Sequence, residues 1–318
     1  MALHEKELTL FYHFSSYYCQ RSLLTMEEKG LAFKKRLMLP QVHENLEPWY
    51  LDINIKGEIP ALTHGDHSVS DSNQILDYLD KAFPESQRLQ PDERTPEGKK
   101  VQQWRNQIDD VKIELLTVGS IRYRNELTKN ALAPGVILKI AEGSGKNPGA
   151  MYGPFMQKYP KYKEVYEKKI AKWRSLRERY NDYDQVVGEI KRLDVIFDEI
   201  EKQLQETKSQ SGSGEEHWLL GHTFTAADVY LAVLLNRVKY VGLLHHFHGS
   251  KPLLTAYYER LHQRETFLKS CVNLPSMFTS TVIPVMISKL KEMAPIIISI
   301  GVVATALVYG FFYVQRGS

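Results

Sequence analysis

The spacing of hydrophobic and polar residues changes along the first part of the chain. Some segments show the pattern of a strand and others the pattern of a helix. Short apolar runs rich in β-branched and aromatic residues predict strands, and apolar residues at three- and four-residue steps predict helices. The expected strands are residues 8–14, 33–39, 57–62 and 68–69, and the expected helices are residues 15–30, 48–51 and 71–79. The order βαβαββα predicts an α/β domain over residues 1–83, with a mixed sheet and helices on both faces.

A helical pattern dominates after a connecting segment. Residues 84–98 are rich in proline and charge, which predicts an interdomain linker. Beyond it, amphipathic helical patterns cover residues 99–127 and 186–204, with proline and glycine interruptions between them. We therefore expect an all-helical domain over residues 99–274, with a long insertion at about residues 128–185.

The last hydrophobic stretch differs from the others because it has no polar face. Residues 294–314 contain no charged side chain, and an amphipathic connector at residues 275–293 precedes them. A helix of this length spans roughly 30 Å, the thickness of the hydrocarbon core of a bilayer. A buried core helix is the alternative, but such a helix should show a polar face. We expect a C-terminal transmembrane anchor, with the preceding domains in the cytosol.

Composition and charge disfavour several classes of function. The formal net charge of +3 over 318 residues is too small for a nucleic-acid-binding protein, so no nucleic-acid partner is expected. Cys19 and Cys271 are the two cysteines, and Cys19 has no second cysteine three residues away. A reducing compartment therefore fits, and dithiol redox chemistry is disfavoured. His245, His246 and His248 lack cysteine or acidic neighbours, so no metal is expected.

One segment carries a strong excess of positive charge. Residues 158–180 contain nine lysine or arginine residues against three glutamates, with four tyrosines among them. The simplest interpretation is the solvated face of a helix. The expected anchor also makes a contact with anionic lipid or an acidic protein partner plausible.

A capping pattern begins the most apolar helix of the second domain. Thr225 is a suitable N-cap residue, and Asp228, three residues later, makes a capping box with Asp in place of Glu. Phe224 can pack on Val229 as a hydrophobic staple. Residues 229–235 are apolar nearly all round, so we expect this helix in the core. Thr225 and Asp228 are therefore predicted to stabilise the fold and not to act in chemistry.

The motif Ile-Pro-Ala-Leu at residues 59–62, followed by Asp71, Ser72 and a helix, resembles the glutathione-binding signature of cytosolic glutathione transferases. The resemblance implies a thioredoxin-like N-terminal domain, an all-α C-terminal domain and a cis peptide before Pro60. It implies that the backbone of Ile59 pairs with the cysteinyl backbone of glutathione, as an added strand would. Ser72 and the N–H groups of its helix would bind the γ-glutamyl carboxylate. Asp71, where the family usually has Glu or Gln, would accept the ammonium group.

A hydroxyl group at the end of the first strand is the candidate for the reacting centre. In serine-type transferases, such a hydroxyl donates a hydrogen bond to the glutathione thiolate and lowers the pKa of the thiol. By this resemblance, Ser16 is the candidate catalytic residue and Ser15 is the second choice. The alternative is that Ser16 only caps the first helix. A cap accepts a hydrogen bond and an activator donates one, and one serine can do both, so the sequence does not separate the two roles.

Two departures from ordinary transferases indicate one branch of this family. Ordinary members have a short turn between their fourth and fifth helices and no terminal membrane span. The long insertion and residues 294–314, with the motifs Glu-Pro-Trp-Tyr at residues 47–50 and Phe-Thr-Ala-Ala-Asp-Val at residues 224–229, are similar to ganglioside-induced differentiation-associated protein 1 and its relatives. The resemblance implies a place in the mitochondrial outer membrane facing the cytosol, an influence on fission and network shape, and a disputed transferase activity.

Three functions fit these features. The first is a regulator of mitochondrial fission, network shape and redox state that binds glutathione or another ligand in a transferase-type pocket. The second is an active, membrane-tethered glutathione transferase that conjugates lipophilic electrophiles, with Ser16 stabilising the thiolate. The third is a scaffold with a vestigial pocket. A homodimer is compatible with each, and an anchor in the endoplasmic reticulum has physics similar to one in the mitochondrial outer membrane.

Overall fold

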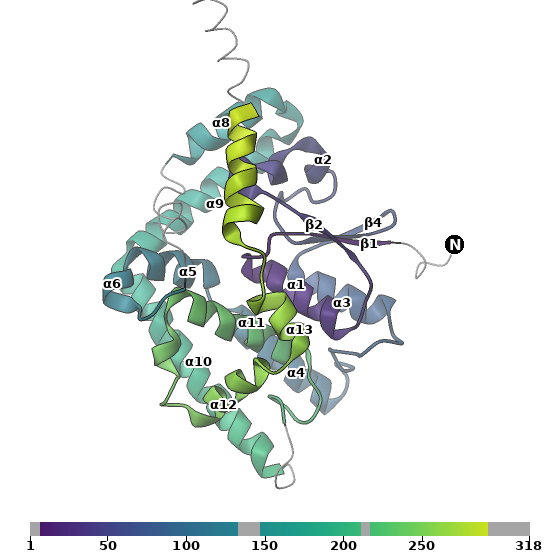
Figure 1. Cartoon of the computed structure of the whole chain (residues 1–318), viewed down its shortest axis with the longest axis vertical. Helices are drawn as coiled ribbons and strands as arrows, with labels where there is room; N and C mark the ends of the chain where they lie inside the picture. The colour runs from purple at the N-terminus through teal and green to yellow at the C-terminus, as the bar shows by residue number, and fades with distance from the viewer. Residues whose placement is uncertain (1–6, 133–146, 211–216, 292–318) are drawn as a thin grey trace, which may run out of the picture. The chain divides into compact units, whose positions relative to one another are not determined.

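The computed structural model describes residues 7–132, 147–210 and 217–291 (Figure 1). The chain divides into two units, one of residues 1–38 and 45–274 and the other of residues 39–44 and 275–318. The predicted transmembrane stretch lies outside the described residues. Within the described ranges, every helix is too short or too polar to cross a membrane.

Four strands form the mixed sheet of the first unit, in the order β2-β1-β3-β4. The central strand β1 (Leu8–Tyr12) pairs in parallel with β2 (Lys34–Leu37) and antiparallel with β3 (Ala61–His64), and β3 pairs antiparallel with β4 (His67–Ser70). The strand order agrees with the prediction of a mixed sheet. β3 begins later than predicted, after Pro60, because proline has no N–H to donate to the ladder.

Helices lie on both faces of this sheet, as predicted (Figure 1). On one face, the short helix α2 (Pro48–Leu51) contributes Tyr50, which packs with Phe11 of β1 and Ala61 of β3. On the other face, α1 (Tyr17–Glu28) and α3 (Ser72–Ala82) pack against each other and join the main core. The α/β domain is therefore thioredoxin-like in its layers.

The first helix of the second domain, α4 (Pro96–Asp109), begins inside the stretch predicted as the linker. Thr95 caps this helix, since its Oγ1 accepts a hydrogen bond from the Gly98 N–H at 3.0 Å. Pro96 has the fixed backbone angle that suits the first helical position. The linker prediction used proline and charge alone and did not include this cap.

Helices make up most of the remaining described residues of the second domain, and α8 and α9 lie in the predicted insertion. Their bounds are α5 (Ile113–Arg122), α6 (Arg124–Leu127), α8 (Pro148–Lys158), α9 (Lys163–Asn181), α10 (Tyr183–Gln210), α11 (Ala226–Val241), α12 (Pro252–Leu261) and α13 (Glu265–Phe267). A π-helical turn, η6 (Leu268–Val272), follows α13. The helix α11 packs against α1, α4, α5 and α12, and its residues Val229, Leu231 and Leu234 are fully buried. The prediction that this helix lies in the core is confirmed.

The second unit has one short turn and one helix among the described residues. The turn η2 (Pro40–Val42) lies in a segment where the Leu39 N–H donates to Glu44 Oε2 at 2.8 Å. Residues 277–291 are helical, with a π-helical turn at η7 (Phe278–Val282). Large apolar side chains on this helix are exposed, namely Phe278, Ile283, Met286, Ile287 and Leu290. The segment predicted as an amphipathic connector is thus largely helical.

Candidate functional site

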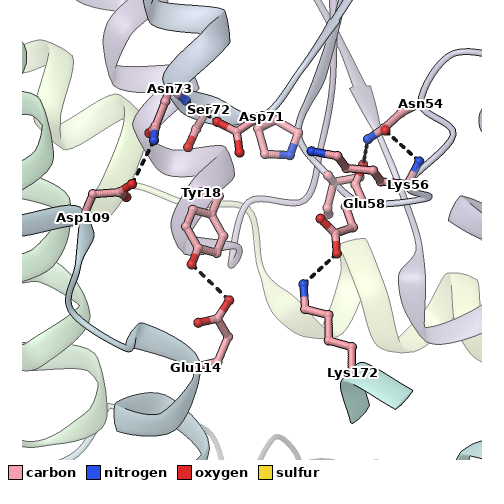
Figure 2. Close-up of a pocket in the computed structure, with 12 residues that line it drawn as sticks. Tyr18, Asn54, Lys56, Glu58, Asp71, Ser72, Asn73, Asp109, Glu114 and Lys172 are labelled. Carbon is pink, nitrogen blue, oxygen red and sulfur yellow. Dashed lines mark hydrogen bonds and ion pairs between the residues drawn. The ribbon is translucent and has the colours of Figure 1, made fainter. Parts of the chain in front are cut away.

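A cavity of about 230 Å³ opens in the first unit, between the α/β domain and the helices of the second domain (Figure 2). The four residues predicted to bind glutathione are among those that line it. The described residues that line it are Tyr18, Asn54, Lys56, Glu58, Ile59, Pro60, Asp71, Ser72, Asn73, Asp109, Glu114 and Lys172. The sequence motif and the cavity therefore coincide.

Side chains fix the segment that brings Ile59 to the cavity. The Ile59–Pro60 peptide is cis, as the resemblance implied. Just before it, the Glu58 carbonyl accepts hydrogen bonds from Tyr50 Oη at 2.6 Å and from Asn54 Nδ2 at 2.7 Å. These bonds fix the backbone on the N-terminal side of Ile59. An extended peptide can pair with a backbone segment held in this way, as in β-strand addition.

The helix α3 begins at another side of the cavity, with Asp71 as its N-cap. The Asp71 carboxylate accepts a hydrogen bond from the Asn73 N–H at 2.8 Å. The φ angle of Asp71 is 84°, a value that residues other than glycine rarely adopt and that is often found at ligand sites. Ser72 is buried and lines the cavity at the first helical position. A helix N-terminus attracts anions, so this end of the cavity suits a carboxylate, with Asp71 available for a neighbouring ammonium group.

A polar network joins this helix N-terminus to the helical domain. Asn73 Nδ2 donates to Asp109 Oδ2 at 2.8 Å, and the Tyr230 hydroxyl donates to Asn73 Oδ1. Asp109 also forms an ion pair with the guanidinium of Arg21, whose side chain is 2% exposed. A buried guanidinium needs an anionic partner, and Asp109 is that partner. Together these bonds connect α1, α3, α4 and α11 beside the cavity.

Ser16 is the N-cap of α1, which is one of the two roles predicted for it. Its Oγ accepts a hydrogen bond from the Cys19 N–H at 3.4 Å. Ser16 is not one of the described residues that line the cavity, and Ser15 Oγ lies 2.8 Å from His13 Nδ1. Burial raises the pKa of the Cys19 thiol to about 12, so this cysteine is not reactive. A thiolate-stabilising role for Ser16 stays a prediction.

A tyrosine hydroxyl that the sequence analysis did not single out reaches the cavity. The Tyr18 hydroxyl donates to Glu114 Oε1 at 3.0 Å (Figure 2). Burial and the neighbouring Glu114 carboxylate raise the pKa of Tyr18. The two residues lie 96 positions apart in the chain, so no local sequence pattern connects them.

Another side of the cavity is formed by the insertion. Lys172 of α9 lines the cavity, and its Nζ lies 2.7 Å from Glu58 Oε1. One turn earlier, Lys169 Nζ donates to the Gly57 carbonyl at 2.9 Å. Burial lowers the pKa of Lys169 to about 8. Two lysines of the basic segment at residues 158–180 therefore contact the N-terminal domain of their own chain.

Tyrosines of the basic segment pack on the same domain. The Tyr166 hydroxyl donates to the Leu46 carbonyl at 2.9 Å, and the Tyr162 hydroxyl donates to Asp52 Oδ1 at 2.6 Å. Both rings belong to a hydrophobic cluster that includes Leu46. These contacts fix the insertion against the segment around α2, which sets the position of the lysines on α9.

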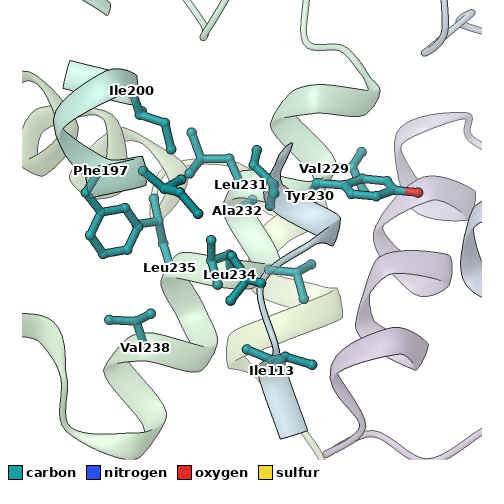
Figure 3. Close-up of a cluster of buried hydrophobic side chains, with 14 of the residues drawn as sticks. Ile113, Phe197, Ile200, Val229, Tyr230, Leu231, Ala232, Leu234, Leu235 and Val238 are labelled. Carbon is teal, nitrogen blue, oxygen red and sulfur yellow. The ribbon is translucent and has the colours of Figure 1, made fainter. Parts of the chain in front are cut away.

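The predicted capping box is formed, and both of its residues are buried. Apolar residues of α11 that follow it in the chain, among them Val229 and Leu231, lie in the main hydrophobic cluster (Figure 3). Asp228 Oδ2 accepts hydrogen bonds from the Thr225 N–H and the Thr225 hydroxyl, both at 2.8 Å. Asp228 Oδ1 accepts from the Leu219 N–H at 2.8 Å and from the Tyr257 hydroxyl at 2.9 Å. Burial raises the pKa of Asp228, and these hydrogen bonds act in the opposite direction. These four hydrogen bonds of the Asp228 carboxylate thus come from buried groups of the same domain, in agreement with a role in stabilising the fold.

The histidines noted in the sequence do not gather into a metal site. His246 Nδ1 lies 3.0 Å from Asp194 Oδ2, and the rings of His245 and His246 are 4.3 Å apart between centroids. In the part of the chain that the structure describes, no group of three or more His, Cys, Asp or Glu residues is arranged to hold a metal ion.

Both domains match known protein families. The family profile described as "Glutathione S-transferase, N-terminal domain" matches residues 10–87, and "Glutathione S-transferase, C-terminal domain" matches residues 178–261. The solved structure of the beta-etherase LigF from Sphingobium sp. strain SYK-6 has a TM-score of 0.60 at 20% identity, and the match covers 83% of this chain and 98% of that chain. Ure2p in complex with glutathione has a TM-score of 0.58 at 15% identity, with the same coverage of 83% and 98%. These matches show the glutathione transferase fold.

A mouse protein is similar to the chain over most of its length. Ganglioside-induced differentiation-associated protein 1-like 1 from Mus musculus is 30% identical over 301 residues, which are 91% of this chain and 81% of the mouse protein. A match of this length extends beyond the two transferase domains. The chain therefore belongs to the ganglioside-induced differentiation-associated protein 1 family, a glutathione transferase-like family.

Proposed function

We propose that this chain is a tail-anchored, glutathione-binding protein of the mitochondrial outer membrane. Its folded domains face the cytosol, and ligand binding in the cavity regulates mitochondrial fission, network shape and redox state. Support comes from the family and from the cavity that gathers Ile59, Pro60, Asp71 and Ser72. The uncharged residues 294–314 support the anchor, and an anchor in the endoplasmic reticulum is the alternative.

The observation that favours binding over turnover is the placement of the hydroxyl groups. The Ser16 hydroxyl caps α1 and Ser16 is not among the described residues that line the cavity, whereas the Tyr18 hydroxyl, whose residue does line it, donates to Glu114. Of the four carboxylates that line the cavity, Glu58 is paired with Lys172 and Asp109 with Arg21, whereas Glu114 accepts the hydrogen bond of Tyr18. A negative charge beside a thiol raises the pKa of the thiol and so disfavours the reactive thiolate. The cavity therefore suits a bound peptide better than an activated thiol.

The second candidate is an active transferase that conjugates lipophilic electrophiles at the membrane. It is favoured by the position of Ser16 at the N-terminus of a helix, where the partial positive charge of α1 stabilises a nearby anion. In this case the Ser16 hydroxyl would donate a hydrogen bond to the thiolate of glutathione while its oxygen still accepts the capping bond of α1. The electrophile would be concentrated by the membrane that holds the anchor.

The full-length chain in lipid nanodiscs separates these functions. Glutathione binding is measured by calorimetry, and conjugation is measured with a chlorinated dinitrobenzene. We expect binding without turnover, binding about tenfold weaker in Ser72→Ala because a charge-assisted contact is lost, and unchanged binding in Ser16→Ala. Turnover that Ser16→Ala abolishes would establish the enzyme instead. If the chain neither binds glutathione nor turns it over, a scaffold with a vestigial pocket is the remaining function. Melting curves check the fold of each variant, because loss of the Ser16 cap costs about 1 kcal/mol.

The location is tested separately from the chemistry. A fluorescent protein fused to residues 276–318 should label mitochondria, and the full chain should resist extraction by alkaline carbonate. Release into the supernatant would refute the anchor and leave the ligand site unaffected. In cells, replacing the chain with Ser72→Ala should alter mitochondrial shape if ligand binding is regulatory.

Two partner proposals accompany this function. Lys163 and Lys168 of α9 have exposed side chains, which is compatible with a contact to anionic lipid or an acidic protein. A homodimer is the other proposal. Vesicle sedimentation with and without anionic lipid tests the first, and light scattering of the detergent-solubilised chain tests the second.

A further inference from the structure

The insertion adds a positive charge to the cavity from outside the two matched family domains. The profile matches end at residue 87 and resume at residue 178, whereas Lys172 lies between them on α9 and lines the cavity. The aromatic contacts of α9 with the segment around α2 place this lysine. The cavity of this chain therefore has a charged group that the two domain profiles do not include.

Lys172 lies at the part of the cavity that contains Glu58, away from the N-terminus of α3 (Figure 2). Its ammonium group points to the Glu58 carboxylate, at 2.7 Å between Nζ and Oε1. Lys56 also lines this part of the cavity, and Lys169 is held one turn away by the Gly57 carbonyl. Three lysines thus surround the position of one carboxylate.

The titration of Glu58 supports a favourable position for an anion. Burial acts to raise the pKa of Glu58, but the hydrogen bond and charge of Lys172, with the charges of Lys169 and Lys56, hold it below its usual value. The field of the three lysines does not depend on which molecule carries the negative charge. A carboxylate of a ligand in the same place is stabilised in the same way.

The ion pair between Lys172 and Glu58 is easy to exchange. The two side chains are 61% and 43% exposed. Exposed ion pairs contribute little to stability, because solvent screens them and both side chains lose freedom when they pair. A ligand carboxylate can therefore replace Glu58 at Lys172 at small cost to the fold.

We propose that Lys172 binds a second carboxylate of the ligand, and that the Glu58 carboxylate occupies this position when no ligand is bound. The inference rests on the proposed function, because it takes glutathione as the ligand. With the γ-glutamyl end at α3 and the middle of the peptide at Ile59, the glycine carboxylate is the group left for Lys172. The cavity then selects peptides that are anionic at both ends, and Glu58 acts as an internal competitor.

The test compares glutathione with glutathione monoethyl ester, in which the glycine carboxylate is neutral and the rest of the peptide is the same. Calorimetry on the full-length chain in nanodiscs measures both affinities for the wild type, Lys172→Met, Glu58→Gln and a matched control. The control is Lys168→Met, since Lys168 lies on the same helix and pairs with Glu164. Melting curves verify that α9 stays folded.

We expect Lys172→Met to weaken glutathione binding about fivefold and to leave the ester unchanged, as for the loss of a partly exposed ion pair. Glu58→Gln should strengthen glutathione about twofold and not the ester, because the competitor is removed. Lys168→Met should change neither. Equal effects of Lys172→Met on both ligands, or no effect on glutathione, would overturn the inference while the proposed function stands. A wild type that binds neither ligand would overturn the proposed function itself, and this inference with it.

Discussion

An aspartate takes part in the N-terminal capping of both α3 and α11, as the N-cap residue Asp71 in α3 and as the third helical residue Asp228 in α11, and the two carboxylates have opposite surroundings. At the start of α11, Asp228 is fully buried and accepts hydrogen bonds from Thr225, Leu219 and Tyr257. At the start of α3, Asp71 is exposed, lines the cavity and accepts a hydrogen bond from the Asn73 N–H of its own helix. An aspartate in the first turn of α11 thus closes that helix end, whereas an aspartate at the N-cap of α3 leaves the other end open.

The difference lies in what each carboxylate can still accept. The oxygens of Asp228 are used by internal donors, so this site stabilises the fold. Asp71 keeps acceptor capacity and faces a cavity, and its φ of 84° is held in place although glycine would adopt it more easily. Strained, incompletely paired groups beside a cavity are typical of ligand sites. The contrast separates a structural aspartate from a binding aspartate, and mutations can test it.

The largest effect is expected at the closed helix end. Asp228→Ala leaves the Leu219 and Thr225 N–H groups and the Tyr257 hydroxyl buried without an acceptor, which should cost about 3–5 kcal/mol of stability. We expect a fall in the melting temperature of about 10 °C, measured by circular dichroism. Tyr257→Phe removes a single donor and should cost only about 1 kcal/mol. If Asp228→Ala melts at the same temperature as the wild type, Asp228 does not stabilise the fold, and the contrast between Asp228 at α11 and Asp71 at α3 is wrong.

At the open helix end, stability and binding should separate. Asp71→Gly removes a capping carboxylate but places glycine at a positive φ, so the free energy of unfolding should change by less than about 1 kcal/mol. Glutathione affinity should fall about tenfold, because the acceptor for the ammonium group is lost. Calorimetry and melting curves measure the two quantities on one sample. Asp71→Asn, which keeps the cap without the charge, is the control. Large destabilisation with unchanged affinity would contradict the assignment.

Local motifs were enough to predict part of both helix ends. The capping box of Thr225 and Asp228, and the group of Ile59, Asp71 and Ser72, follow from residues close together in the chain; the structure forms the capping box and places the other three residues in the lining of one cavity. Spacing within one strand or helix carries this information. The glutathione transferase fold was predictable for the same reason. Its strands and helices show in the periodicity of apolar residues, and the motif at residues 59–72 is local as well.

The remaining groups of the cavity come from distant parts of the chain. Tyr18 meets Glu114 and Glu58 meets Lys172 only after the helical domain packs on the α/β domain. The basic segment showed no period that would indicate which lysines face solvent and which face the cavity. The sequence also drew attention to the Ser16 hydroxyl, but not to Tyr18, which lines the cavity. Packing between distant segments brings these side chains together. The local spacing of residues in one sequence does not predict which distant residues will meet.

The smallest effect concerns the lysine beside the open site. Burial lowers the pKa of Lys169 to about 8, below its ordinary value of 10.5. Between these values the unfolded chain binds more protons than the folded chain, so the Lys169 contribution makes stability rise with pH over this window. The gain should be at most about 1 kcal/mol, because solvent screens a half-buried group. Urea unfolding at pH 7.5 and pH 10 should show it in the wild type and in Lys168→Met, but not in Lys169→Met. If the free energy of unfolding changes equally with pH in the wild type and in Lys169→Met, burial of the Lys169 ammonium group does not reduce stability. Asp71 would then be the remaining residue that distinguishes the open helix end from the closed one.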